Sequence, residues 1–421
     1  MRDAMVPPGS PPAVILGFEL NGLGVARALN RHGVKCIGLS EPLPNPAWKT
    51  NTCKVVTCAE WSRHAVLEKL VEIARAHARK LPLLITKDVS VQWVSDARDE
   101  LAEFYEFALP EKAVVDALLD KAAFAQLSAE EGWPIPRTWK IQSKQELLSV
   151  LEEVPFPCIL KPETHLDLFA QRSPRKAFKL SDADELVRTY DMAAQWTSRL
   201  VLQEWIHGGD DRIAFCLTYF GRDGSPHALF AGRKLRQFPP ECGNTALCEP
   251  APPSWREPLC SLTQRIWRSV GFRGLGSIEY KMRLESDQPV IMEPTVGRTN
   301  YQNELAVLNG VNIPLIAYCD LVGLPRPTVA TSSRSYKLVD GPRELLSARY
   351  YWRNGMLTRR QWVRDRRGRG RYMTLRADDP GPFVASLRGG VRPLAGFLVE
   401  SVFGHAAKER LKRAIQSTRT S

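Results

Sequence analysis

The sequence predicts a doubly wound α/β domain followed by a unit of α+β type. Residues 13–41, AVILGFELNGLGVARALNRHGVKCIGLSE, place an apolar run, a glycine-rich turn, an amphipathic stretch and a second apolar run in the order of a βαβ unit. A helix at about 62–79, a strand at 81–86 and a helix at about 88–105 continue this alternation. Strands and hairpins mixed with helices then replace it from Cys158 to about residue 325.

With 421 residues, the chain is longer than one hydrophobic core usually serves. We predict five segments: a flexible start (1–12), the α/β domain (13–112), a first α+β subdomain with a linker helix (113–198), a second subdomain (199–328) and a basic C-terminal extension (329–421). Within the extension, the arginine-rich stretch 359–372 predicts an exposed turn or hairpin.

Charge and cysteine usage narrow the class of protein. The net charge is +12, and residues 331–421 hold 20 Lys/Arg against 7 Asp/Glu, so the basicity belongs to the extension. The nine cysteines are odd in number and never spaced C-x-x-C, which argues against a disulfide framework or a zinc finger. Without an apolar run of membrane-spanning length or a signal-peptide pattern, a cytoplasmic location is expected.

Two glutamates carry the chemistry that the sequence suggests. Residues 276–294, GSIEYKMRLESDQPVIMEP, predict a hairpin whose turn centres on Ser286, and this register places Glu279 opposite Glu293. Facing carboxylates repel each other unless a cation lies between them, and Mg²⁺ favours such oxygen ligands. The alternative is a surface ion-pair cluster in which Lys281 or Arg298 neutralises both acids.

Basic residues recur where a triphosphate would need them. Lys161 ends the apolar strand CILK, Lys121 begins a helix, and Arg233 and Lys234 lie on the strand HALFAGRKLRQF. Each alone is more typical of a solvated charge, but together with the glutamate pair they favour a phosphate site.

A segment at 200–215, LVLQEWIHGGDDRIAF, connects two apolar strands through a glycine-containing turn. Such a connection can offer backbone groups to an adenine edge and a carboxylate to a ribose. The alternative is an ordinary loop between strands.

Six stretches of the chain, spread over about residues 13–325, together resemble the ATP-grasp superfamily in its carboxylate–amine ligase-like branch. In order along the chain they are ILGFELNGLGVARAL, DKAAF, CILKP, VLQEWIHGGDDRI, GLGSIEYK and IMEPTVGRTN. The resemblance implies a Rossmann-like N-terminal domain and two α+β subdomains that clasp ATP. For the nucleotide it implies Lys121, Lys161, Glu204, Trp205, Ile206 and Asp211. For Mg²⁺, or Mn²⁺ in its place, it implies Glu279 and Glu293, and for catalysis it implies Arg298 with Arg233 and Lys234.

The chain departs from the family pattern in two places. Thr295 stands where relatives commonly carry Asn, so Asn300 or a water is expected to fill that metal position. The loop 163–178 has no glycine, so we expect Arg172, Arg175 and Lys176 to cover the phosphates by charge.

The resemblance implies a ligase that needs no enzyme nucleophile. ATP phosphorylates a substrate carboxylate, and an amine then attacks the acyl phosphate to form an amide, so the protein supplies positioning and charge neutralisation. A sugar acid, an amino acid or a peptide would fit as substrate.

Two other classes compete with this interpretation. Gly17, Gly22, Gly24 and Glu41 imitate a dinucleotide fingerprint of an NAD(P)-dependent oxidoreductase, but the spacing G-x4-G-x-G is wrong for it. A non-catalytic binder would act through the basic segment, where 396–415 combines an apolar face with Lys408, Arg410, Lys412 and Arg413.

The same segment suggests peripheral contact of the enzyme with an anionic membrane or polymer at the inner face of the membrane, while a core-docked helix is the simpler alternative. No RNA-binding signature occurs, so no specific nucleic acid is expected. A homodimer is the default oligomer.

Overall fold

The computed structural model describes residues 5–162, 177–240, 243–298, 300–329 and 335–388. These form two compact units, one of residues 1–120 and 208–388 and one of residues 121–207, and each is treated by itself below. The predicted helix within 396–415 lies outside the described residues.

A five-stranded parallel sheet opens the first unit, in the order β3-β2-β1-β4-β5. Its strands are β1 (Ala13–Leu16), β2 (Cys36–Ser40), β3 (Lys54–Thr57), β4 (Leu81–Ile85) and β5 (Tyr105–Glu106). The helical elements are α1 (Leu20–Asn30), η1 (Pro46–Lys49), α2 (Arg63–Arg75), α3 (Asp88–Asp96), α4 (Arg98–Leu101) and α5 (Lys112–Leu119). The predicted helix at 88–105 is wrong in extent, because the backbone leaves helical geometry at Ala97 and the segment ends in β5.

The first unit also contains a mixed seven-stranded sheet, in the order β14-β13-β10-β11-β12-β15-β16. Its strands are β10 (Ile213–Phe220), β11 (Pro226–Phe238), β12 (Asn244–Pro250), β13 (Gly274–Met282), β14 (Pro289–Val296), β15 (Tyr336–Val339) and β16 (Arg369–Tyr372). The helices that accompany it are α10 (Pro253–Ser269), α11 (Asn303–Leu308), α12 (Ile313–Val322), α13 (Gly341–Arg353), α14 (Arg359–Arg366) and α15 (Gly381–Arg388).

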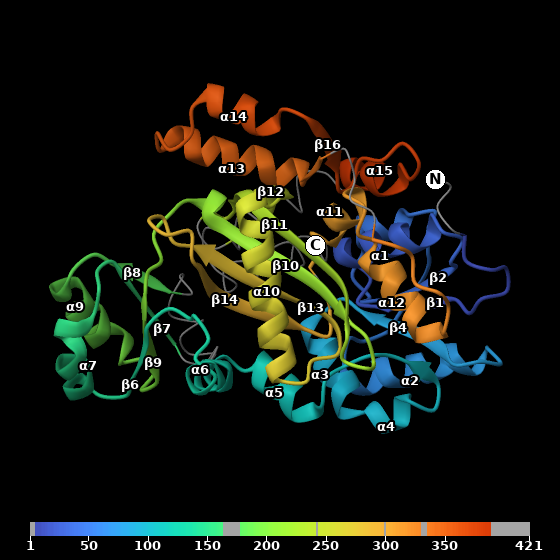
Figure 1. The fold of residues 1–421 in the computed structure, drawn as a ribbon, viewed down its shortest axis with the longest axis horizontal. Helices are drawn as coiled ribbons and strands as arrows, with labels where there is room; N and C mark the ends of the chain where they lie inside the picture. Colours follow the sequence, from blue (N-terminus) through green and yellow to red (C-terminus); the bar gives the residue numbers. More distant parts are fainter. Residues whose placement is uncertain (1–4, 163–176, 241–242, 299, 330–334, 389–421) are drawn as a thin grey trace, which may run out of the picture. The chain divides into compact units, whose positions relative to one another are not determined.

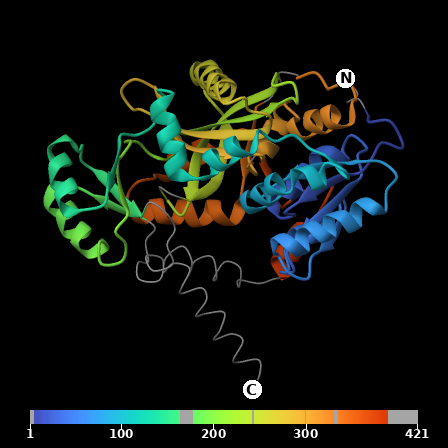
Figure 2. The same cartoon turned by 90° about the horizontal axis from the view of Figure 1, so that it is seen from below.

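Helices α10 and α13 lie on opposite faces of this sheet (Figure 2). On the α10 face, the Tyr280 hydroxyl of β13 lies 2.7 Å from the hydroxyl of Thr263. Because neighbouring residues of a strand alternate between faces, Glu279 projects from the α13 face. Helix α13 therefore covers the face from which the predicted metal ligand projects.

The C-terminal residues 336–388 are built into the first unit. Strand β15 pairs with β12, β16 pairs with β15, and α13 and α14 lie side by side (Figure 1). The predicted turn or hairpin at 359–372 is wrong. Thr358 and Gln361 form a capping box that begins α14, and the chain then continues into β16.

Buried ion pairs attach residues 336–388 to the rest of the first unit. Glu344 of α13, with 0 % of its surface exposed, receives hydrogen bonds from the Arg236 guanidinium of β11 at 2.7–3.0 Å. Asp379 accepts a 2.8 Å bond from Arg27 of α1. These contacts connect the end of the described chain to both sheets of the first unit.

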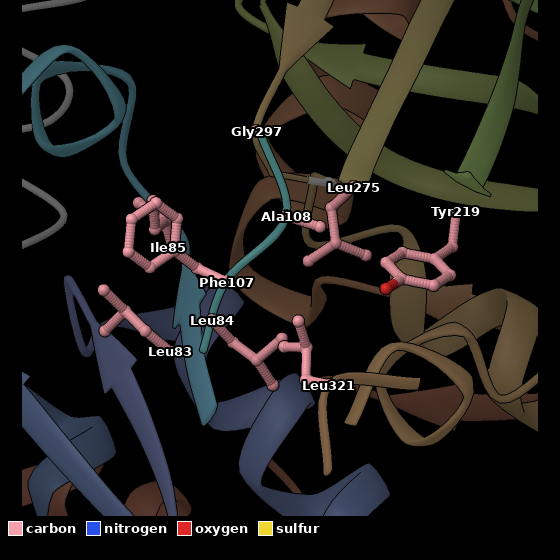
Figure 3. A pocket seen from close by; sticks show the side chains of 9 residues that line it. All are labelled: Leu83, Leu84, Ile85, Phe107, Ala108, Tyr219, Leu275, Gly297 and Leu321. Atoms are coloured by element: carbon pink, nitrogen blue, oxygen red, sulfur yellow. The ribbon is translucent and has the colours of Figure 1, made fainter. Parts of the chain in front are cut away.

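An apolar seam joins the two sheets of the first unit. Figure 3 shows it where β4, the segment at 107–108, β10, β13 and α12 meet. Tyr219 contributes the one polar side chain among the lining residues, and its hydroxyl donates to Asp320 at 2.8 Å. The lining suits core packing better than recognition of a charged substrate.

The second unit is an antiparallel four-stranded sheet in the order β6-β9-β7-β8. It comprises α6 (Lys121–Glu130), β6 (Thr138–Ile141), α7 (Lys144–Val150), η2 (Leu151–Glu153), β7 (Cys158–Pro162), β8 (Phe178–Leu180), α9 (Ala183–Ala193) and β9 (Leu200–Glu204). Helices α7 and α9 lie side by side on this sheet (Figure 1), and Leu147, Leu160, Leu186 and Leu202 belong to its core.

We predict that Glu344→Gln lowers the free energy of unfolding by about 2 kcal/mol, because Arg236 loses the charge-assisted hydrogen bonds to Glu344 and keeps Asp365 as its carboxylate partner. Urea denaturation of the full chain measures this. The control Glu111→Gln changes an exposed glutamate of the same unit and should stay within about 0.5 kcal/mol of wild type. Equal effects of the two substitutions would contradict the anchoring role of Glu344.

Candidate functional site

Glu279 and Glu293 face each other across β13 and β14, as predicted. From Gly276 to Glu279 the register is the predicted one, but from Tyr280 onward it is offset by one residue. Met292, 40 % exposed, is the extra residue of this β-bulge. The predicted turn centre at Ser286 therefore describes only the half of the hairpin that carries the glutamates.

A buried lysine forms the ion pair of Glu279. The Lys234 ammonium lies 2.7 Å from Glu279 Oε2, and only 4 % of Lys234 is exposed. Of the two alternative cations, Lys281 donates to the Gly208 and Gly209 carbonyls at 2.7 and 3.0 Å, and Arg298 pairs with Asp88. Lys234 thus supplies positive charge on the face where the two carboxylates meet.

The two carboxylates fit Mg²⁺ in chemical type. In the described part of the chain no group of three His, Cys, Asp or Glu side chains could hold a metal. Mg²⁺ is commonly bound by one or two carboxylates and completed by phosphate oxygens and water, so a pair of glutamates is sufficient.

Asn300, predicted as a further metal ligand, lies at the exit from β14. Its Oδ1 accepts a 2.7 Å hydrogen bond from Arg298 Nη1, and its Nδ2 lies 3.4 Å from the Ser277 hydroxyl. Thr295 is buried opposite Ser277. The role of Asn300 as a ligand stays a prediction.

Arg298 follows a glycine that the packing requires. Gly297 has φ +72°, and a Cβ there would lie 2.7 Å from side-chain carbons of Val91 and Leu109. The guanidinium of Arg298 then donates to both carboxylate oxygens of Asp88 at the start of α3, with 2.6 Å to Oδ1. The ion pair connects the end of β14 to the parallel sheet.

The remaining predicted residues of the first unit lie on or near β11. Arg233 donates to Glu249 of β12 at 2.6 and 2.9 Å, and Lys337 lies 3.0 Å from the same carboxylate group. Asp211 is exposed in η3 (Asp210–Arg212), whereas its neighbour Asp210 is buried. Burial is the largest influence on Asp210 and raises the pKa of its carboxyl group.

Four predicted nucleotide residues of the second unit lie on β7 or at the end of β9. Lys161 Nζ donates to Gln203 Oε1 at 3.0 Å, and the Glu204 carboxylate accepts the Arg137 backbone N–H at 3.1 Å. Trp205 stacks under the Lys179 ammonium, 4.0 Å from the ring centroid, and Ile206 is buried.

Lys121 begins α6 and is exposed. Lys176, with Arg172 and Arg175, lies outside the described residues.

Sequence reasoning missed a charged cluster at the carboxyl ends of β1, β2 and β4. Lys87 lies 2.7 Å from Glu19 and also pairs with Glu41. Its ammonium lies 5.3 Å from the ring centroid of Trp61. The rule that ligands bind at the carboxyl ends of parallel strands could have identified these positions.

Comparisons with known proteins extend the sequence resemblance. The chain is 22 % identical to the D-aspartate ligase of Enterococcus faecium (strain Aus0004) over 338 residues, which is 76 % of this chain and 78 % of that protein. It is 27 % identical to a D-alanine–D-alanine ligase of Pseudomonas putida (strain GB-1) over 171 residues, 38 % of this chain and about half (49 %) of that enzyme. No protein-family model matches the chain.

Solved structures share the fold at low sequence identity. The ADP complex of PurK, an N5-carboxyaminoimidazole ribonucleotide synthetase, superposes with a TM-score of 0.61 at 12 % identity, over 84 % of this chain and 87 % of that one. The biotin carboxylase domain of the Hydrogenobacter thermophilus 2-oxoglutarate carboxylase, in complex with MgADP, ADP and bicarbonate, gives 0.56 at 15 % identity over 76 % and 71 %.

These neighbours agree with the expected cofactors ATP and Mg²⁺, and they support neither the oxidoreductase nor the non-catalytic alternative. In sequence and in fold, the chain is similar to ATP-dependent, ADP-forming ligases of the carboxylate–amine branch of the ATP-grasp superfamily.

Proposed function

We propose that this chain forms an amide between the carboxyl group of one small substrate and the amine of another, at least one of them an amino acid. The pairing of Glu279 with Glu293 beside the buried Lys234 carries the proposal. It offers two oxygen ligands for Mg²⁺ and one fixed positive charge, which is what transfer of a phosphoryl group from ATP requires.

The reaction balances in two steps. A carboxylate oxygen of the first substrate attacks the γ-phosphorus of ATP, the bond to the β-phosphate oxygen breaks, and ADP leaves. The second substrate's amine then attacks the acyl carbon, the C–O bond to phosphate breaks, and phosphate leaves while the amine loses a proton. Bound Mg²⁺ would neutralise charge on the β- and γ-phosphates.

We assign Glu279 and Glu293 to Mg²⁺, with Mn²⁺ as its substitute, and Asn300 to a further metal position. Arg233, Lys234 and Arg298 are assigned to the reacting phosphate and carboxylate, and Lys121, Lys161, Lys176, Glu204, Trp205, Ile206 and Asp211 to the nucleotide. Lys161 and Lys234 support the assignment best, because the ammonium group of each is held by a side-chain oxygen. Lys161 donates to Gln203 at 3.0 Å, and Lys234 lies 2.7 Å from Glu279.

An amino acid as substrate is supported by the cluster at the carboxyl ends of β1, β2 and β4. Glu19, Glu41 and Lys87 place two negative charges and one positive charge together. This combination suits a substrate that carries both an ammonium group and a carboxylate. The match to a D-aspartate ligase over most of both chains supports the same class.

We predict that Mg-ATP raises the melting temperature of the protein by several degrees and that NAD(H) does not, because only the nucleotide triphosphate brings a metal to the carboxylate pair. Glu293→Gln should lose most of this shift. The control Glu285→Gln, in the exposed turn of the same hairpin, should keep it. Full Mg-ATP stabilisation of Glu293→Gln would contradict the metal assignment.

A panel of substrates tests the amide-forming reaction. We expect phosphate release from ATP to rise at least about tenfold over background with one amino acid, D-aspartate among the first to be tried, when an amine partner is present. The panel should also include sugar acids and short peptides as carboxylates. Stimulation by a sugar acid alone, with no amino acid in the reaction, would contradict the amino-acid proposal.

We propose further that α13 and α14 give the enzyme a peripheral contact with an anionic membrane. Residues 341–372 hold ten arginines and two acids, and both acids, Glu344 and Asp365, are paired to Arg236. Exposed Leu345, Arg349 and Trp352 follow one another at helical spacing. No helix of the described chain is long and apolar enough to cross a bilayer.

Vesicles containing phosphatidylserine test this contact. We expect the double variant Arg349→Glu, Arg353→Glu to bind them at least about tenfold more weakly, since each basic residue contributes about 1 kcal/mol. The control Arg79→Glu, Lys80→Glu reverses two exposed charges elsewhere in the same unit. Unchanged vesicle binding, or tighter binding to a DNA duplex than to vesicles, would contradict the membrane contact.

The cytoplasmic location stays a prediction, and so does the homodimer, which sedimentation equilibrium tests.

A further inference from the structure

A continuous chain of polar contacts runs from helix α13 to the predicted metal ligand Glu279. The Tyr351 hydroxyl of α13 donates to Asp210 Oδ2 at 2.6 Å. Asp210 Oδ1 accepts from Gln237 Nε2 at 2.9 Å, and Asp210 Oδ2 accepts from the Gln237 backbone N–H at 2.9 Å. Gln237 Oε1 then accepts from Lys234 Nζ at 3.2 Å, and Lys234 reaches Glu279 at 2.7 Å.

The chemistry of these side chains fixes the donor and the acceptor in each of these hydrogen bonds. An ionised aspartate can only accept hydrogen bonds, and a lysine ammonium can only donate them. The Gln237 amide lies between the two, so it must turn its NH₂ group to Asp210 and its oxygen to Lys234. Asp210 therefore determines which end of the amide faces the ammonium.

Burial of these side chains makes the series of hydrogen bonds rigid. Exposed fractions are 6 % for Asp210, 2 % for Gln237, 4 % for Lys234 and 8 % for Tyr351, so bulk water offers few competing partners. Ser347 of α13 also donates to the Gln237 carbonyl at 2.9 Å, and Glu344 binds the neighbouring Arg236. Helix α13 thus contacts β11 both at Arg236 and at the backbone of Gln237.

We propose that Asp210, Gln237 and Tyr351 are positioning residues, which hold the Lys234 ammonium against Glu279 and so set the geometry of the metal-binding carboxylate. The proposal rests on the proposed function, in which Glu279 binds the metal. In this proposal α13, which lies beyond the stretch of family resemblance, helps to set the geometry of the ligase site.

The alternative is that the chain only stabilises the fold. Both interpretations predict a lower melting temperature for variants of Asp210 and Tyr351, so stability does not separate them. The affinity of the folded protein for a metal separates them, because a purely structural contact leaves it unchanged in the fraction that stays folded.

Mn²⁺ binding in the presence of ADP, measured by electron paramagnetic resonance on the full chain, is the test. Loss of a residue that orients a metal ligand typically weakens metal affinity by about 10–100-fold. We expect the lower end, roughly tenfold, for Asp210→Asn and Gln237→Met, and roughly threefold for Tyr351→Phe, which removes one donor only. Tyr350→Phe is the matched control, since Tyr350 is exposed on the same helix.

Tyr351→Phe keeps the test decisive if Asp210→Asn does not fold, because it removes a single hydroxyl. Wild-type Mn²⁺ affinity in folded Tyr351→Phe and Gln237→Met would overturn the positioning role. The variant Glu293→Gln distinguishes failure of the metal assignment from failure of the positioning role. If it abolishes Mn²⁺ binding while the positioning variants bind normally, only the positioning role fails, and if it binds Mn²⁺ like wild type, the metal assignment fails and the positioning role with it.

Discussion

Two carboxylates that face each other across a pair of strands, with one buried lysine beside them, form the constraint on which the site depends. Opposed glutamates destabilise a sheet unless charge compensates them, and Lys234 compensates Glu279 at 2.7 Å. The bulge at Met292 lies next to the pair and lets the rest of the hairpin continue in an offset register. A divalent cation bound to both carboxylates would add positive charge at the point where the two strands bring the carboxylates together.

Keeping a lysine buried needs partners beyond the glutamate. Gln237 accepts one of its hydrogen bonds, and Asp210 and Tyr351 hold that amide in place. Arg236, the residue before Gln237 on β11, is likewise buried and pairs with Glu344 and Asp365. The C-terminal residues that supply Glu344, Tyr351 and Asp365 also extend the same sheet through β15 and β16, which explains why they fold with the first unit.

Sequence patterns predicted the α/β and α+β classes, and they predicted the pairing of Glu279 with Glu293, because a strand period of two and a short turn leave few registers. The bulge was not predictable, since one extra residue leaves no local signal. Asp211 and Asp210 are adjacent and chemically identical, and only the short helix η3 decides which of them is buried. The arginines of 359–372 obscured the capping box that begins α14, because the prediction weighed charge above helix-start signals.

The position of a Mn²⁺ ion in crystals grown with ADP tests the central claim most directly, because its anomalous scattering locates the metal without reference to any assumed role. The account predicts a peak about 2.1 Å from one carboxylate oxygen of Glu279 and one of Glu293. A peak bound by other side chains, with the Glu279–Lys234 pair unchanged and Glu293 turned to solvent, would contradict it.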